Sequence, residues 1–200
     1  MNDKGYEYEY DPYYCYSSTN VLKNKLNIRN PESFFHAERE ISALKVASAL
    51  KNEIGGDFDV NHLKRIHLFL FEDIFEWAGK FRKVNISKGV PFANYDLIEK
   101  YLGEKLDELK DENYLKTCTN KTDLARRLAY YLGEINAVHP FREGNGRTQR
   151  IFIEYLSRHN GYEIDFTKID KDSMIDASIK SFYGDNIPLE NLIMNSLIEL

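Results

Sequence analysis

The sequence predicts an all-α fold with one small β-hairpin. Apolar residues recur at helical spacing over most of the chain, and helix-starting and helix-ending residues separate these stretches. One segment, residues 82–92, instead alternates apolar and polar residues around a glycine turn. We divide the chain into a Tyr-rich N-terminal arm, residues 1–20, and one helical domain, residues 21–200.

The composition is that of a soluble domain with a sizeable core. Of the 200 residues, 42% are hydrophobic and 30% are charged, and the formal net charge is -5. This charge argues against bulk attraction to nucleic acid or to an anionic membrane, and no apolar run is long enough to cross a bilayer. Cys15 and Cys118 form no CxxC motif, so we expect neither a disulfide framework nor a zinc site. The polar N-terminus is not a signal peptide, and we expect a cytoplasmic location.

The arm is rich in tyrosine and acidic residues and poor in aliphatic ones. We interpret it as an extended segment whose rings pack on the domain surface. A partner surface or a modification target is the alternative. The tyrosines in question are Tyr6, Tyr8, Tyr10, Tyr13, Tyr14 and Tyr16.

Helices are expected where apolar stripes follow starting signals. Asp59 and Asp170 are good N-caps, and Pro31 and Pro188 suit a first helical turn. The expected helices cover residues 31–52, 59–79, 94–112, 124–138, 147–159, 170–182 and 188–200. His62 and His67 are five residues apart, which does not suit a metal-binding pair, so we interpret both as structural or surface histidines.

Residues 139–150, HPFREGNGRTQR, link two of these helices. Pro140 must end the first helix, because a residue before proline avoids the α region. This leaves His139 at the mouth of a polar loop, where we expect a general base. Phe141, the apolar residue of the loop, is expected to anchor it in the core.

The same loop is suited to binding phosphates. Glu143 is expected to be a Mg²⁺ ligand, and the alternative is a surface carboxylate paired with Arg142 or Arg147. The turn Gly144-Asn145-Gly146 permits close backbone approach and leads into a helix N-terminus. Arg147 and Arg150 share a helix face at that end. Two arginines and free amides at one place favour a multiply charged ligand, most simply a nucleoside triphosphate or diphosphate.

The hairpin at residues 82–92 has two interpretations. It is either a connector or an exposed edge that binds the backbone of another chain. We favour the second, because an unpaired edge beside a catalytic loop otherwise invites aggregation. The docking residues expected there are Lys83, Val84, Asn85, Ile86, Lys88 and Gly89.

Residues 139–150 resemble the motif of the Fic family, His-Pro-Phe-x-(Asp/Glu)-Gly-Asn-Gly-(Arg/Lys)-x-x-Arg, at every specified position. The resemblance extends to Trp77-Ala78-Gly79 before the hairpin and to residues 181–185 after the motif. It implies an all-helical enzyme that transfers AMP from ATP to a Tyr, Ser or Thr hydroxyl of a target protein and releases pyrophosphate. The chain's own arm is one candidate target.

The resemblance also assigns roles to single residues. It makes His139 the base that deprotonates the target hydroxyl and Glu143 the ligand of Mg²⁺ on the α- and β-phosphates. It places phosphates against Gly144, Asn145 and Gly146, with Arg147 and Arg150 at the β/γ end. It puts the hairpin beside the target backbone, and adenine near Tyr183.

Related activities stay open on the motif alone. Gly144, Gly146 and Arg147 argue against the use made of this loop by the phosphorylating Doc branch, whose loop is lysine-bearing and glycine-altered. A phosphocholine-transferring relative keeps much of the motif, so transfer of another phosphate-bearing group is an alternative. A non-catalytic nucleotide-sensing module is a further alternative, although such a module needs neither His139 nor Glu143.

Many family members are inhibited by a helix with the pattern Ser/Thr-x-x-x-Glu-(Gly/Asn), whose glutamate pairs with the second motif arginine. Here Glu38 comes one residue late after Ser33, and Glu190-Asn191 lacks the preceding Ser or Thr. We hypothesise that the chain has no working internal inhibitor and that Glu38 lies on a helix surface. A small antitoxin and a second copy of this chain stay open as partners.

Overall fold

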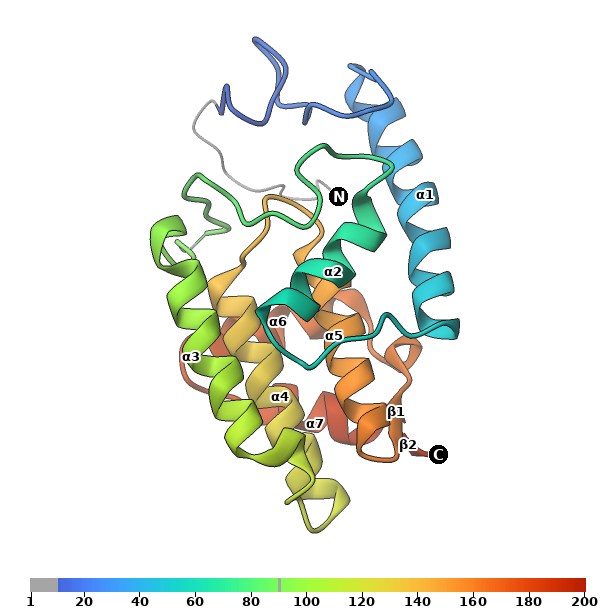
Figure 1. Cartoon of the computed structure of the whole chain (residues 1–200), viewed down its shortest axis with the longest axis vertical. Coiled ribbons are helices and arrows are strands. Elements are labelled where there is room, and N and C mark those ends of the chain that lie inside the picture. The colour runs from blue at the N-terminus through green and yellow to red at the C-terminus, as the bar shows by residue number, and fades with distance from the viewer. Residues whose placement is uncertain (1–10, 90) are drawn as a thin grey trace.

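The computed structural model describes residues 11–89 and 91–200 and confirms the all-α class. Two central helices, α4 and α5, are surrounded by the others (Figure 1). The helices are α1 Pro31–Lys51, α2 Val60–Phe71, α3 Ile98–Asp111, α4 Lys121–Val138, α5 Asn145–His159, α6 Lys171–Phe182 and α7 Ile187–Ser196. Short 3₁₀ turns cover Tyr95–Leu97, Asn113–Leu115 and Phe166–Lys168.

Four of the helices, α1, α2, α4 and α6, begin at side chains that satisfy free amides of their first turn. Asn30, Asp59, Asn120 and Asp170 each accept a hydrogen bond from the amide three residues ahead. These caps replace partners that the first turn of a helix cannot find within itself. The predicted starts at Asp59 and Asp170 are thus confirmed. Helix α4 starts slightly earlier than expected, after Asn120.

The second helix is shorter than the sequence predicts. It ends at Phe71, and residues 72–80 continue as a chain of turns rather than as helix to Gly79. In these turns Ile74 and Phe75 are buried, and Phe75 stacks on Trp77 with ring centroids 4.2 Å apart. Apolar spacing alone did not reveal the change, because buried turns and buried helices place apolar residues alike.

The core lies between the two central helices and the helices packed on them. Helix α4 contacts α3, α5, α6 and α7, whereas α5 contacts α1, α2, α4 and β1. The loop that joins α4 to α5 therefore starts from the two most enclosed elements of the fold. Because α4 and α5 are fixed on several sides, the loop at their junction is held by rigid elements.

The regular strands lie away from residues 82–92. Strand β1, Tyr162–Ile164, pairs antiparallel with β2, Leu197–Glu199, where the last helix was expected to continue. Residues 82–92 fold back through one isolated antiparallel bridge, Ser87 with Pro91, and a hydrogen bond from the Phe92 N–H to the Ile86 carbonyl at 3.2 Å. We call residues 82–92 the flap. It is a loop that reverses direction and forms no regular strands among its described residues.

Part of the predicted arm packs into the fold, and residues 1–10 lie outside the described part. Tyr14 is buried, and its ring meets Trp77 edge-on with centroids 5.4 Å apart. Tyr13 is 55% exposed. The interpretation of an arm that packs through aromatic rings thus holds for Tyr14. None of the described helices combines the length and apolar character that a bilayer crossing requires.

Candidate functional site

The loop between α4 and α5 is built around Phe141 and Asn145. Phe141 is buried, as expected, and stacks on the His67 ring with centroids 3.8 Å apart. The Asn145 carboxamide closes the loop: its Oδ1 accepts from the Phe141 N–H and its Nδ2 donates to the Phe141 carbonyl, both at 2.8 Å. The Asn145 side chain is therefore committed to shaping the loop, since both ends of its amide are hydrogen-bonded to Phe141.

Gly144 allows the tight turn into α5. Its φ is +80°, and a Cβ there would lie 2.3 Å from the Phe71 ring. As the N-cap of α5 it offers no side chain to the first helical amides. Free amides and the positive end of a helix dipole favour an anion, so this turn is suited to binding one.

His139 ends α4 in a left-handed conformation, with φ 50° and ψ 62°. The ring is buried and stacks on Phe92 of the flap, with centroids 3.9 Å apart and planes 14° apart. Its Nδ1 lies 3.3 Å from the Asn136 carbonyl. A carbonyl only accepts, so Nδ1 carries the proton in this pair and the Nε2 lone pair is left as the basic site.

Burial lowers the pKa of His139 to about 3. The hydrogen bond to the Asn136 carbonyl opposes this shift, and the positive charges of Arg82 and Lys88 add to it. The imidazole is consequently neutral at pH 7. A neutral imidazole is the form that can accept a proton from a hydroxyl.

Glu143 lies beside the first turn of α5 with its side chain 30% exposed. Its Oε1 accepts from the Gly144 N–H at 2.9 Å and lies 3.7 Å from Arg147 Nη2. The alternative pairing with Arg147 is therefore present in this structure. The carboxylate is accessible and next to the anion-binding turn, which fits a ligand for Mg²⁺ that also contacts phosphate.

Glu38 is not on the helix surface, and that prediction is wrong. It lies buried on the inner face of α1, and its Oε1 is 2.7 Å from Arg147 Nη1. Ser42, one turn later, accepts from the same nitrogen at 2.5 Å. Burial raises the pKa of Glu38, and the Arg147 guanidinium opposes that rise. Spacing along one helix could not reveal this pair, because α1 and α5 meet only in the tertiary structure.

The two motif arginines have different surroundings. Arg147 points to α1, whereas the Arg150 Nη1 lies 3.2 Å from where a Cβ of Gly146 would be, and so lies against the turn. Burial, followed by the charge of Arg147, lowers the pKa of Arg150. Within the described part of the chain, Arg150 forms no ion pair. The hypothesis that no acidic residue disables Arg150 stays a prediction.

The flap lies next to the loop, and most of the predicted docking residues are accessible. Ile86 is buried and anchors the flap, whereas Val84 is half-buried. The Asn85 Oδ1 accepts from the Tyr95 N–H at 3.0 Å. The exposed positions are Lys83, Asn85, Lys88 and Gly89.

Tyr183 lies at the C-terminal end of α6 and is 70% exposed. Its ring contact is with Phe182, and it forms no hydrogen bond or ring contact with the loop. Its expected role near adenine therefore stays a prediction.

Sequence reasoning did not identify several residues that shape the site. His67 Nδ1 accepts from the Gly79 N–H at 2.8 Å, and its Nε2 donates to the Glu143 carbonyl at 3.0 Å. Arg142 forms a buried ion pair with Asp11 of the arm at 3.0 Å. Only the structural role of His67 was foreseen. Nothing in the local sequence shows which distant groups these side chains reach.

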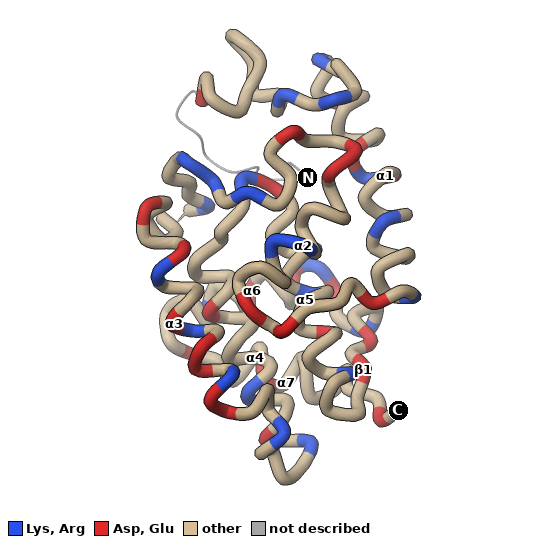
Figure 2. The backbone as a smooth tube through the Cα atoms, viewed as in Figure 1, with Lys and Arg blue, Asp and Glu red and all other residues tan. Residues whose placement is uncertain are grey.

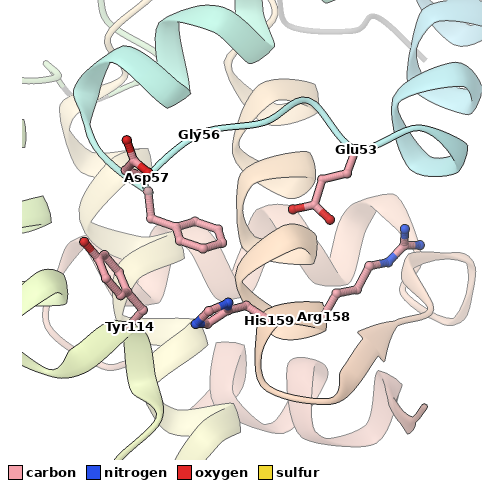
Figure 3. Close-up of a pocket in the computed structure, with 7 residues that line it drawn as sticks. Glu53, Gly56, Asp57, Tyr114, Arg158 and His159 are labelled. Carbon is pink, nitrogen blue, oxygen red and sulfur yellow. The ribbon is translucent and has the colours of Figure 1, made fainter.

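A hollow at the C-terminal end of α5 differs from the 139–150 loop in the groups that line it. It has a volume of about 330 Å³ and contains acidic, basic and aromatic groups (Figure 3). Its lining residues are Glu53, Gly56, Asp57, Phe58, Tyr114, Arg158 and His159. It contains no residue of the 139–150 loop. Acidic and basic residues are also interspersed along the rest of the chain, as they are along α3 (Figure 2).

Comparison with known proteins places this site in a family. A family model described as Fic/DOC family matches residues 57–157. Protein adenylyltransferase VbhT of Bartonella schoenbuchensis is 40% identical over 97% of this chain, which spans 40% of that relative. A probable protein adenylyltransferase, Fic, of Escherichia coli K12 is 37% identical over 94% of this chain and 93% of its own length. The crystal structure of BepC from Bartonella tribocorum with bound AMPPNP has a TM-score of 0.86 and 29% identity, over 94% of this chain and 97% of that one.

Proposed function

We infer that this chain, which belongs to the Fic/DOC family, is a protein adenylyltransferase that transfers AMP from ATP to a hydroxyl of a target protein. The observation that carries this inference is the loop itself. A buried neutral histidine, an accessible carboxylate, a glycine turn at a helix N-terminus and two arginines meet within one α4–α5 junction. Several similar proteins are adenylyltransferases by name, and BepC binds an ATP analogue.

His139 is the general base in this proposal. Its Nε2 takes the proton of a Tyr, Ser or Thr hydroxyl while the hydroxyl oxygen attacks the α-phosphorus of ATP. The bond from the α-phosphorus to the bridging oxygen breaks, and pyrophosphate leaves. Proton transfer to a positioned base contributes about 10² to 10⁴ in rate.

The anionic groups are held by the N-terminal turn of α5. The backbone at Gly144, Asn145 and Gly146 binds phosphate oxygens, and Arg147 and Arg150 neutralise the β/γ end. Such electrostatic stabilisation and positioning supply most of the catalysis in phosphoryl-type transfers. Tyr183, exposed at the end of α6, contacts adenine in this proposal.

Glu143 is the residue that holds Mg²⁺. The donor is a hard oxygen, partly exposed, at a place where phosphates also supply oxygens. When bound, Mg²⁺ offsets the charge of the phosphates and of the leaving pyrophosphate. The chain's own contribution is to keep this carboxylate beside the turn, where the Gly144 N–H already binds it.

The flap binds the backbone of the target. The flap is joined to the ring of His139, since Phe92 at its end stacks on that ring, and four of its predicted docking residues are exposed. A target segment laid along Lys83 to Gly89 would carry its hydroxyl toward the base. We further propose a cytoplasmic location and a small antitoxin as partner. A second copy of the chain is an alternative partner.

The test is labelling of protein by ATP. Purified chain is incubated with Mg²⁺ and α-labelled ATP, with and without cell lysate, and proteins are examined by intact mass. The expected result is an added AMP on a protein, on the lysate target or on this chain. The His139→Ala variant should lose this label. Absence of label with the wild type, or undiminished label with the variant, contradicts the proposal. A panel of other nucleotide donors and a phosphocholine donor identifies the transferred group.

A further inference from the structure

One buried arginine connects the flap to the catalytic histidine. Arg82 is 2% exposed, although it carries a guanidinium group. Its side chain donates to the carbonyls of Val84 at 2.7 Å and Ala93 at 2.5 Å, on either side of the flap. It also donates to the carbonyls of Val138 at 3.1 Å and His139 at 2.9 Å.

The backbone of the same residue extends this connection. The Arg82 N–H donates to the Pro140 carbonyl at 2.9 Å. Three successive carbonyls at the end of α4 and the start of the loop, those of Val138, His139 and Pro140, are therefore bound by one residue. The carbonyls on the last turn of a helix lack helical partners and carry the negative end of its dipole, so those at the end of α4 favour a cationic donor.

Arginine suits this place better than any other side chain. A guanidinium group has five N–H donors in a rigid plane, so it can serve several carbonyls at once. Lysine has three donors on one nitrogen at the end of a flexible stem, so its donors cannot spread over carbonyls as widely separated as those that a planar guanidinium serves.

The connection is located where the backbone is strained. His139 has φ 50° before a proline, a conformation that residues other than glycine rarely adopt. Such conformations persist when the surroundings hold them. The bonds of Arg82 on both sides of this residue supply that hold, together with the stacking of Phe92 on the imidazole.

We propose that Arg82 is a positioning residue that fixes the flap relative to His139, so that a hydroxyl on a flap-bound target meets the basic Nε2. This proposal rests on the proposed function of the flap and of His139. Arg82 donates to backbone carbonyls of the flap side and of the His139 side, so it acts through backbone geometry. A shift of about 1 Å in such geometry can cost about 10²-fold in rate.

The test variant is Arg82→Lys, which keeps the positive charge and loses the planar group of donors. Its matched control is Arg158→Lys, because Arg158 also connects separate segments, binding Glu154 and the Leu50 carbonyl at the far end of α5. Three quantities are measured for each: amide hydrogen exchange of residues 84–95, affinity for AMPPNP with Mg²⁺, and the rate of AMP transfer to the protein labelled by the wild type.

In Arg82→Lys we expect faster exchange at Phe92 and Ala93, AMPPNP affinity within about twofold of the wild type, and transfer slower by about 10²-fold. In Arg158→Lys all three should stay near wild-type values even where its melting temperature falls. Unchanged flap exchange in Arg82→Lys overturns the proposal. So does a loss of AMPPNP affinity as large as the loss of transfer, since that indicates general structural damage.

A failure of this proposal can be distinguished from a failure of the proposed function. If the wild type labels no protein, the adenylyltransferase inference fails by that result alone. Hydrogen exchange then still tests whether Arg82 fixes the flap, because it needs no activity. Faster exchange at residues 84–95 in Arg82→Lys alone supports the connection, and equal exchange in both variants contradicts it.

Discussion

Glu38 of α1 and Arg147 of α5 form an ion pair, with 2.7 Å between Glu38 Oε1 and Arg147 Nη1. The glutamate is buried, and the arginine is the first of the two in the loop motif. The pair places a negative charge close to the group that we propose binds the β/γ end of ATP. The charge of Arg147 is thus partly neutralised before any nucleotide arrives.

Replacing this carboxylate should strengthen nucleotide binding. In Glu38→Gln the side-chain volume is kept and the negative charge is lost, so repulsion of the phosphates falls by about 1 kcal/mol. We expect AMPPNP to bind about fivefold more tightly by titration. Glu40→Gln, at an exposed position of the same helix, is the control. Unchanged affinity contradicts the charge argument, and a many-fold gain in transfer beyond the affinity change would make Glu38 an internal inhibitor.

A side chain at position 144 should destabilise the protein. In Gly144→Ala the new Cβ meets the Phe71 ring at 2.3 Å while φ stays positive. Strain and overpacking together should lower the free energy of unfolding by about 3 kcal/mol in urea titrations. Gly161→Ala tests the strain alone, because Gly161 has φ +84° and open space around its Cβ. Equal losses in the two variants would show that the contact with Phe71 has no role.

Acid should weaken the fold through its buried histidines. Burial lowers the pKa of His67 and of His139 to about 3, whereas an unfolded histidine titrates near 6.5. Between these values the unfolded chain binds more protons, so stability is fully present above pH 6.5 and is lost as the pH falls toward 3. Each histidine contributes at most about 1.4 kcal/mol per pH unit.

The measurement is the free energy of unfolding between pH 7 and 5 for the wild type and for His67→Gln. Glutamine offers an acceptor oxygen and an NH₂ donor group, and can serve the Gly79 N–H and the Glu143 carbonyl. The variant should lose less stability per pH unit than the wild type, whatever its stability at pH 7. Parallel pH curves would show that His67 takes no part in the acid response.

Removing the Glu143 carboxylate should weaken the affinity for Mg²⁺. In Glu143→Gln the half-maximal Mg²⁺ concentration for AMP transfer should rise by at least about tenfold, the range found even for outer partners of metal ligands. Binding of AMPPNP without Mg²⁺ should not weaken, because the carboxylate removed in this variant repels phosphate in the wild type. A variant with wild-type Mg²⁺ dependence would assign the metal to other groups.

The amino-acid sequence alone determined the helical class, most helix starts and the composition of the loop. These are local properties: a cap such as Asp59 acts on amides three residues away, and a proline ends the helix beside it. For the same reason residues 139–150 could be interpreted as a phosphate-binding turn before any neighbour was known. Gly144 and the burial of Phe141 followed from the same local reasoning.

Only the tertiary structure decided which distant groups meet that loop. Glu38 reaches Arg147 because α1 packs against α5, and the wrong expectation for Glu38 came from spacing within one helix. Arg82 reaches the end of α4, and Asp11 reaches Arg142, across long stretches of sequence. Buried charges need partners, but a linear pattern does not specify them, because any of several carboxylates or carbonyls satisfies the same chemistry. The structure thus selects the partners, whereas the sequence provides the loop that they hold.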